Sequence, residues 1–356
     1  MKTSQGIALN KLSVNEHISY EISESQMVDI GDREDHKTKG EYRDIAEANG
    51  AKTSHDKAKE VPITNKHTYD KYLGIIKDFG RFCCDHGAGR DPSGWTNKYV
   101  EQFLTDKLES GYSFKTLNNI PCALNKWAEI HNSATGDHIN YDKPIAEFRA
   151  KIEDLREDYK NSLENRAFED PQKIVDNMPS EKGQFAASMA LNYGLRASNC
   201  IRFELNLKDA SWTDKHGNLH EAKAGTLHVV SKNHYVRENF EVSKEDFAKL
   251  EKYAEEARSL GILKEEKDVN GNTFRQTFNL PNYNYNKFNR EVKKSARACG
   301  VDEQKASPHS FRFNYAQYLY DKLRSEGMTD KQAKYRVSHA LFHGRLDITE
   351  RYLGGR

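Results

Sequence analysis

The chain has 356 residues, of which 31% are charged and 36% are hydrophobic, and its formal net charge is +1. This length predicts two or more domains. No run approaches the roughly 20 apolar residues of a membrane span, and we expect no secretory signal because the N-terminus lacks an apolar stretch. The five cysteines lack metal-ligand spacing, so we expect reduced thiols in a cytoplasmic protein.

Charge is distributed unevenly along the chain. Residues 281–356 contain 15 Lys and Arg against 8 Asp and Glu, a net charge of +7, whereas residues 1–60 contain 9 against 12, a net charge of −3. A basic C-terminal part is typical of a phosphate-binding face. Scattered, solvated charges would give the same counts, so charge alone does not decide between these interpretations.

Residues 1–60 are polar with few large apolar side chains, which predicts an N-terminal arm or extension that is partly disordered. Residues 64–160 instead place apolar side chains at helical spacing, with Thr64 as a candidate N-cap. Four or five short amphipathic helices in this range predict a helical bundle. Four basic residues of the bundle are candidates for phosphate-backbone contacts, although a solvated face is at least as good an interpretation of each: Lys66, Lys71, Lys115 and Lys126.

Residues 166–356 predict a second domain that is mainly helical and has a small antiparallel β-sheet. Asp170-Pro171 indicates a helix start, and another helix is expected over 183–193. A basic helix is expected over 286–299, with side chains suited to phosphate contacts. Its candidate contact residues are Lys287, Arg290, Lys293 and Lys294.

The pattern changes from helical to alternating over 226–230 and 235–242, and these segments flank Ser231-Lys232-Asn233-His234. This arrangement predicts a β-hairpin with Lys232 at its tip. A lysine at a hairpin tip is usually solvated. Beside a cluster of cationic side chains, however, a mobile ammonium group can reach into a groove as a proton donor.

Arginine, histidine and tyrosine gather in the C-terminal part of the chain. His309 and Arg312 form a His-x-x-Arg pair at a predicted helix start, and His343 precedes Tyr352 by nine positions. Further upstream, Arg196 follows a Gly-Leu turn after a predicted apolar helix. A fixed cluster of Arg and His beside a Tyr on a mobile terminal turn indicates attack of a phenolate on a phosphodiester.

Plainer interpretations exist for these residues. An arginine such as Arg196 is, taken alone, more often structural or solvated, and Tyr352 has a core aromatic role as its alternative. His339 and His343 stand four positions apart and are candidate metal ligands on one helix face. Because no His-Glu-x-x-His pattern and no clear third ligand are present, we expect no metal and no cofactor.

Gly194-Leu195-Arg196, the hairpin Lys232, His309-x-x-Arg312 and His343 followed nine residues later by Tyr352 resemble, in this order, the tyrosine recombinases, also called phage integrases. The resemblance covers residues 166–353, as the catalytic domain. The helical region 64–160 is similar to the family's core-DNA-binding domain, a SAM-like bundle. The resemblance implies a site-specific recombinase, the integrase of a mobile genetic element, that cuts and rejoins duplex DNA through a 3′-phosphotyrosyl intermediate.

The family also implies a homotetramer on its DNA sites, a bacterial or phage-encoded protein acting on the nucleoid in the cytoplasm, and room for an accessory DNA-bending or excision protein. No metal or other cofactor is implied. The implied catalytic residues are Arg196, Lys232, His309, Arg312, His343 and Tyr352. The arginines would neutralise the phosphate oxygens, the histidines would hydrogen-bond the transition state, the lysine would protonate the departing 5′ oxygen, and the tyrosine would attack.

The sequence departs from the family pattern at three places beside these residues. Asn199 stands where an acidic residue usually supports the first arginine, Phe313 stands where a His commonly follows the second arginine, and Phe342 replaces the usual Gly before His343. Two other functions fit part of the pattern. They are a type IB topoisomerase that relaxes supercoiled DNA and a DNA-binding protein of the same fold that does not cut.

Overall fold

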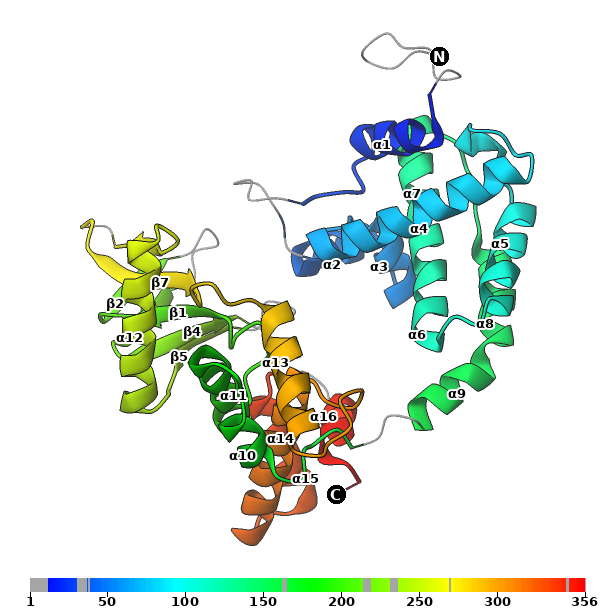
Figure 1. The fold of residues 1–356 in the computed structure, drawn as a ribbon. Helices are drawn as coiled ribbons and strands as arrows, with labels where there is room; N and C mark the ends of the chain where they lie inside the picture. Colours follow the sequence, from blue (N-terminus) through cyan, green and yellow to red (C-terminus); the bar gives the residue numbers. More distant parts are fainter. Residues whose placement is uncertain are drawn as a thin grey trace. The chain divides into compact units, whose positions relative to one another are not determined.

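The structure is a computed structural model that describes residues 12–30, 37, 39–161, 165–213, 219–230, 236–268, 270–343 and 346–355. It divides into two compact units, Met1–Ser162 and Leu163–Arg356, which we describe one at a time (Figure 1). Both units are mainly helical, and the named strands all belong to the second unit. Within the described ranges, no helix combines the length and apolar character needed to cross a bilayer.

The first unit is a helical bundle built around α7. Its elements are α1 (Val14–Glu24), α2 (Lys39–Ala48), α3 (Ser54–Glu60), α4 (Lys66–Asp85), α5 (Asn97–Glu109), α6 (Phe114–Leu117), α7 (Asn119–Thr135), α8 (Asp142–Lys151), α9 (Glu153–Asn161) and a short 3-10 turn, Pro92–Gly94. Three aromatic side chains, Phe79, Trp95 and Trp127, are almost fully buried at its centre. Helices α4 and α7 pack against each other (Figure 1). The Trp95 ring lies 5.7 Å from each of the other two rings, so one aromatic cluster joins these helices.

The predicted N-terminal arm is, in its described part, folded onto this bundle. Helix α1 begins at a capping box formed by Ser13 and Glu16, and its Ile18 side chain is fully buried. The buried His131 of α7 hydrogen-bonds Glu21 of α1 at 2.8 Å and Asp137 at 3.0 Å. Burial lowers the pKa of His131, but the two carboxylates outweigh burial and the net shift is upward. The few apolar residues of this stretch are therefore enough to dock it.

Lys126, predicted to contact DNA, is instead a buried structural residue. Its ammonium group donates to the backbone carbonyls of Ala58, Lys59 and Val61 at 3.0, 3.1 and 3.0 Å, at and just beyond the C-terminal end of α3. Burial lowers the pKa of Lys126 to about 8. Lys126 is only 9% exposed, and its ammonium group already donates to three carbonyls. We therefore no longer propose it as a DNA contact.

The second unit combines a small antiparallel sheet with helices, as predicted. Its helices are α10 (Pro171–Asp176), α11 (Glu181–Tyr193), α12 (Lys244–Ser259), α13 (Tyr285–Ala298), α14 (Pro308–Ser325), α15 (Asp330–Ala340) and α16 (Leu346–Leu353). Its strands are β1 (Arg202–Asn206), β2 (Ala210–Thr213), β3 (Leu219–Ala222), β4 (Thr226–Val230), β5 (Val236–Phe240), β6 (Lys264–Lys267) and β7 (Thr273–Asn279). The predicted hairpin strands pair as β4 and β5, whereas its tip, including Lys232, lies outside the described residues.

Five strands form one sheet in the order β5-β4-β1-β7-β6, and β2 pairs separately with β3. Apolar side chains of the sheet, such as Phe203 and Phe278, meet Phe185 of α11 and Tyr253 of α12 in the main core. Helix α14 contributes Phe311, which is fully buried in the same core. Since α14 also packs against α11, α15 and α16, its first two turns lie where these helices converge.

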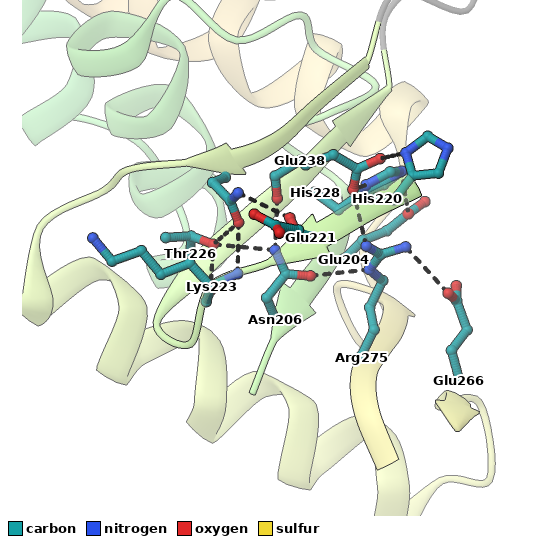
Figure 2. Close-up of polar contacts among 11 residues, drawn as sticks. Glu204, Asn206, His220, Glu221, Lys223, Thr226, His228, Glu238, Glu266 and Arg275 are labelled. Atoms are coloured by element: carbon teal, nitrogen blue, oxygen red, sulfur yellow. Dashed lines mark hydrogen bonds and ion pairs between the residues drawn. The ribbon is translucent and has the colours of Figure 1, made fainter. Parts of the chain in front are cut away.

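A buried polar network ties the strands together (Figure 2). Arg275 of β7 is 3% exposed and donates to Asn206, Glu238 and Glu266 at 3.0, 3.1 and 3.1 Å. Glu238 also contacts Nδ1 of His228 at 2.7 Å, and its pKa is lowered because hydrogen bonds and cations outweigh burial. The network joins β1, β4, β5, β6 and β7, which fixes the strands on either side of the predicted hairpin tip.

Replacing Lys126 with Met should destabilise the first unit by about 2 kcal/mol, because it leaves buried carbonyls without a donor. The measurement is urea unfolding followed by tryptophan fluorescence in a Trp212→Phe background, which leaves Trp95 and Trp127 as the reporters. Lys115→Met removes an exposed lysine and should change stability by less than about 0.5 kcal/mol. Equal stabilities of the two variants would contradict the structural role of Lys126.

Candidate active site

Helix α14 places His309 and Arg312 on one face in its first turn. Ser307 and Ser310 form a capping box there, and Pro308 occupies the first helical position. A spacing of three residues puts the two side chains next to each other on a helix. Arg312 is 1% exposed, so its guanidinium group projects into the protein rather than into solvent.

The turn that carries Arg196 is fixed by a glycine and by Arg312. Gly194 ends α11 with φ +64, and a side chain there would collide with the Tyr315 ring, so the position requires glycine. Its carbonyl accepts a hydrogen bond from Nη1 of Arg312. The carbonyl of Arg196 accepts from the amides of Asn199 and Cys200 at 2.8 and 3.0 Å. Arg196 is therefore held beside α14 by a short, closed turn.

The turn after α15 places His343 on the other side of Arg312. Nη2 of Arg312 donates to the Leu341 carbonyl and lies 3.5 Å from Nε2 of His343. The His343 amide donates to the Ser338 carbonyl at 2.9 Å, and the Ser338 hydroxyl donates to the His343 carbonyl at 3.1 Å. Nδ1 of His343 faces the Thr349 hydroxyl at 3.1 Å, which orients the ring from α16.

Tyr352 of α16 closes the cluster. Its hydroxyl hydrogen-bonds Nε2 of His309, and its ring lies 4.9 Å from the His343 ring. The ring stacks on Phe313 with centroids 4.4 Å apart and planes at 26°. Nε2 of Gln317 donates to the Tyr352 carbonyl at 3.0 Å. Only 8% of Tyr352 is exposed, so the phenol is held inside the cluster by contacts from α14.

The site is cationic and partly desolvated. Burial and the nearby arginines lower the pKa of His309 to about 4 and that of His343 to about 3, so both rings are neutral at pH 7. Burial lowers the pKa of Arg312 to about 10, against the attraction of Tyr352, and burial also lowers the pKa of Arg196. Both guanidinium groups stay protonated at neutral pH, and neither pairs with a carboxylate among the residues that the structure describes.

Each arginine also presents a buried donor that the protein leaves unpaired. In the described ranges, three buried side-chain nitrogens or oxygens lack a hydrogen-bond partner, and two of them are Nη1 of Arg196 and Nε of Arg312. Buried polar groups are nearly always hydrogen-bonded, because an unpaired one costs roughly 1–3 kcal/mol. Two orphaned guanidinium donors in one cationic cluster are suited to the oxygens of an anion such as a phosphate.

The structure brings together five of the six expected catalytic residues: Arg196, His309, Arg312, His343 and Tyr352. Lys232 lies outside the described residues. Nδ2 of the Asn199 side chain donates to the Val230 carbonyl at 3.0 Å, at the end of β4. In the described part of the chain, no three His, Cys, Asp or Glu side chains are grouped to hold a metal ion.

The other expected DNA contacts lie on the surfaces of their own units. Lys66 pairs with Asp70, and Lys71 and Lys115 are exposed. On α13, whose buried side packs on α10, α11 and α14, Arg290 and Lys294 are exposed, and two further basic residues are half-buried: Lys287 and Lys293. Two site residues, Thr349 and Gln317, were not predicted. Phe313 was noted in the sequence only as a departure from the family pattern, and its stacking on Tyr352 was not predicted.

Acid should destabilise the second unit through His309 and His343. Both pKa values are lowered on folding, so their stabilisation is complete above the unfolded pKa of about 6.5 and is lost as pH falls toward 4 and 3. The melting temperature of wild type should therefore drop more between pH 6.5 and 4.5 than that of His309→Asn/His343→Asn. The contribution of His131 to the pH dependence is the same in both proteins and cancels in the comparison. Parallel pH profiles would show that the rings are not buried as described.

Comparisons with known proteins find a fold but no close relative. No family model and no curated protein matches the sequence. Among solved structures, the XerH site-specific recombinase in a post-cleavage complex with palindromic difH substrate aligns with a TM-score of 0.51 and 14% identity. The pre-cleavage complex of XerH with difH substrate gives 0.50 and 13%. Each alignment covers 95% of this chain and 90% of the other.

A Tn1549 transposon integrase in complex with transposon right end DNA aligns with a TM-score of 0.43 and 14% identity, covering 87% of this chain and 92% of that one. We base the fold on the two XerH structures. Their alignments run through both units, and the fold they share with this chain is the one that the sequence resemblance predicts. The chain shares its fold with the XerH site-specific recombinase.

Proposed function

We propose that this protein is a site-specific tyrosine recombinase, the integrase of a mobile genetic element, which cuts and rejoins duplex DNA. The observation that carries the proposal is the pair of orphaned donors, Nη1 of Arg196 and Nε of Arg312, in the same cluster as the Tyr352 hydroxyl. A phosphodiester placed there would receive both donors on its non-bridging oxygens. The same phosphorus atom would then face a nucleophile.

The proposed first step is attack of the Tyr352 hydroxyl oxygen on phosphorus. His309 is neutral at pH 7, and its Nε2 is hydrogen-bonded to the phenol. A bound phosphate would offset the cationic charge that lowers the pKa of this ring, and Nε2 would then accept the phenolic proton. A new bond forms between the tyrosine oxygen and phosphorus, the bond to the 5′ oxygen breaks, and that oxygen takes a proton from Lys232. The product is a 3′-phosphotyrosyl bond, which a 5′ hydroxyl of a second strand reverses.

The arginines and His343 would act on the transition state. Negative charge on the phosphate oxygens is greatest when five oxygens surround phosphorus, and preorganised donors stabilise that charge most. Nε2 of His343 lies beside Arg312, where a hydrogen bond to the same oxygens is available if Nε2 carries the proton. The chemistry uses side chains of this chain alone, so we propose that it needs no metal and no nucleotide.

The assembly follows from the family resemblance rather than from the contacts described above. We propose a homotetramer that holds two DNA duplexes and exchanges strands sequentially, with an accessory DNA-bending or excision protein as an additional partner. XerH, one of the similar solved structures, is bound to its difH substrate. The exposed basic residues of α13 are the proposed backbone contacts in the second unit.

Two other functions share much of this site. A type IB topoisomerase would use the same nucleophile but would relax supercoiled DNA as a monomer. A DNA-binding protein of this fold would keep the arginines and would not cut. The position of the Tyr352 hydroxyl against a neutral histidine favours a cutting enzyme, and strand exchange between two duplexes distinguishes a recombinase from a topoisomerase.

The first test is covalent trapping on a nicked suicide duplex that carries the candidate site, in EDTA, read by the mobility of the protein–DNA band in an SDS gel. Wild type should form a covalent band, because the phosphotyrosyl bond survives SDS, and Tyr352→Phe should form none. Tyr318→Phe, which removes an exposed tyrosine, should behave as wild type. A band that persists in Tyr352→Phe would assign the nucleophile to another residue, and DNA binding without any band would favour the non-cutting protein.

Arg290→Gln/Lys294→Gln on the exposed side of α13 should weaken duplex binding to a similar extent on every sequence. The slope of log K against log salt is negative, and each lost phosphate contact makes it shallower by about 0.9. The double variant should therefore have a slope shallower by roughly 2. Fluorescence anisotropy at four or five salt concentrations measures it. Lys252→Gln, on the exposed side of α12, is the matched control, and a slope unchanged in the α13 variant would remove this helix from the DNA interface.

A further inference from the structure

We propose that Arg237 is a positioning residue that holds the turn of His343 in its reactive geometry. The proposal rests on the proposed function, because His343 matters only if the site acts on a phosphate. Arg237 stands on β5, far from the site in sequence. Among its contacts are His339 and Phe342, which lie just before His343.

The turn contains a backbone conformation that its residue does not favour. Phe342 has φ +55, in the left-handed region where a side chain costs roughly 1–2 kcal/mol and where glycine is the default. The ring is nevertheless 6% exposed and is stacked with Phe240 of β5 at 6.0 Å and 29°. The side chain that causes the strain is therefore also the one that anchors the turn to the sheet.

Arg237 of β5 contacts the same turn. Its guanidinium carbon lies 4.2 Å from the centre of the Phe342 ring, well within the range of a cation–π interaction. Nη2 donates to the His339 carbonyl and lies 3.1 Å from His339 Nδ1. That carbonyl belongs to the last turn of α15, where the helix dipole favours a cation. One planar side chain thus binds both the end of the helix and the strained residue after it.

The held turn connects directly to the cationic cluster. The Leu341 carbonyl, between the two residues that Arg237 contacts, accepts from Arg312. His343 follows Phe342 and faces Arg312 with Nε2 at 3.5 Å. If the Phe342 ring lost its contacts with Phe240 and Arg237, they would no longer offset the strain of the left-handed backbone. The Leu341 carbonyl and the His343 ring would then shift together. The hydrogen bond from Arg312 to that carbonyl would be displaced as well.

The test compares Arg237→Ala, Arg237→Lys, Phe342→Gly and the double variant Arg237→Ala/Phe342→Gly with wild type. Arg258→Ala, which removes an exposed arginine at the end of α12, is the matched control. Single-turnover cleavage of the nicked duplex is measured at saturating protein. Arg237→Ala should slow cleavage roughly 10- to 100-fold, the scale of a misplaced group, with DNA affinity unchanged. Lysine keeps the charge and a donor but not the planar fork, so Arg237→Lys should recover part of the rate.

The double variant isolates the coupling between the two side chains. Without the Phe342 ring the arginine keeps its bond to the His339 carbonyl but loses its contact with the strained residue, so Arg237→Ala should add much less to Phe342→Gly than it costs in wild type. Equal costs in both backgrounds would overturn the proposal. So would wild-type cleavage by Arg237→Ala. A variant that cleaves normally at saturation but binds DNA weakly would make Arg237 a DNA contact instead and would also overturn it.

A readout without DNA separates this inference from the proposed function. The His343 imidazole is titrated by NMR in histidine-labelled protein and assigned with His343→Asn. In wild type its pKa is lowered to about 3, and loosening the turn should raise it toward the ordinary value. A shift in Arg237→Lys, or in Arg237→Ala where that variant folds, supports the positioning role even if no DNA is cleaved. An unchanged His343 titration in folded variants would overturn that role.

Discussion

The buried guanidinium group of Arg312 is the interaction on which this site depends. It donates to the carbonyl of Gly194, at the end of α11, and to the carbonyl of Leu341, at the end of α15. Burying a charge is costly unless it is hydrogen-bonded, and these carbonyls supply that bonding. Because Arg196 and His343 follow the two carbonyls by two residues each, one side chain both holds the helices together and sets the spacing of the cationic groups around Tyr352.

The arrangement stores unfavourable electrostatic energy in the protein without DNA. Two guanidinium groups and two imidazoles share a partly desolvated space, and the imidazoles give up their protons as a result. Two arginine donors remain unpaired, and the left-handed backbone at Phe342 adds strain. Stable parts of the fold offset these costs: the apolar core under α14 and the Arg275 network across the sheet (Figure 2). A preorganised site of this kind gains its stabilisation when the anion arrives.

Local patterns predicted much of this architecture, because helices and hairpins depend on neighbouring residues. The basic helix expected over 286–299 is α13, and the strands of the expected hairpin pair with each other. The five clustered site residues were all predicted, as a set, from their resemblance to the tyrosine recombinase pattern. What failed depends on contacts between distant segments. The local sequence does not distinguish Lys126 from a surface lysine. Its carbonyl partners lie on and just after α3, more than 60 residues earlier in the chain. The Arg237 contact with the His343 turn, separated by about a hundred residues, has no local signal.

The two arginines of the site differ in how much the fold depends on them, and this difference bears on the interpretation of diverged sequences. Arg312 holds two helix ends by bonds that the fold needs whether or not DNA is cut, so a copy that has lost activity is under pressure to retain it. Nη1 of Arg196 has no partner among the described residues, so no described contact would preserve that group in a copy that no longer performs the proposed cleavage. Under the proposed function, genomic copies that keep Arg312 but have replaced Arg196 should therefore fold without cleaving DNA.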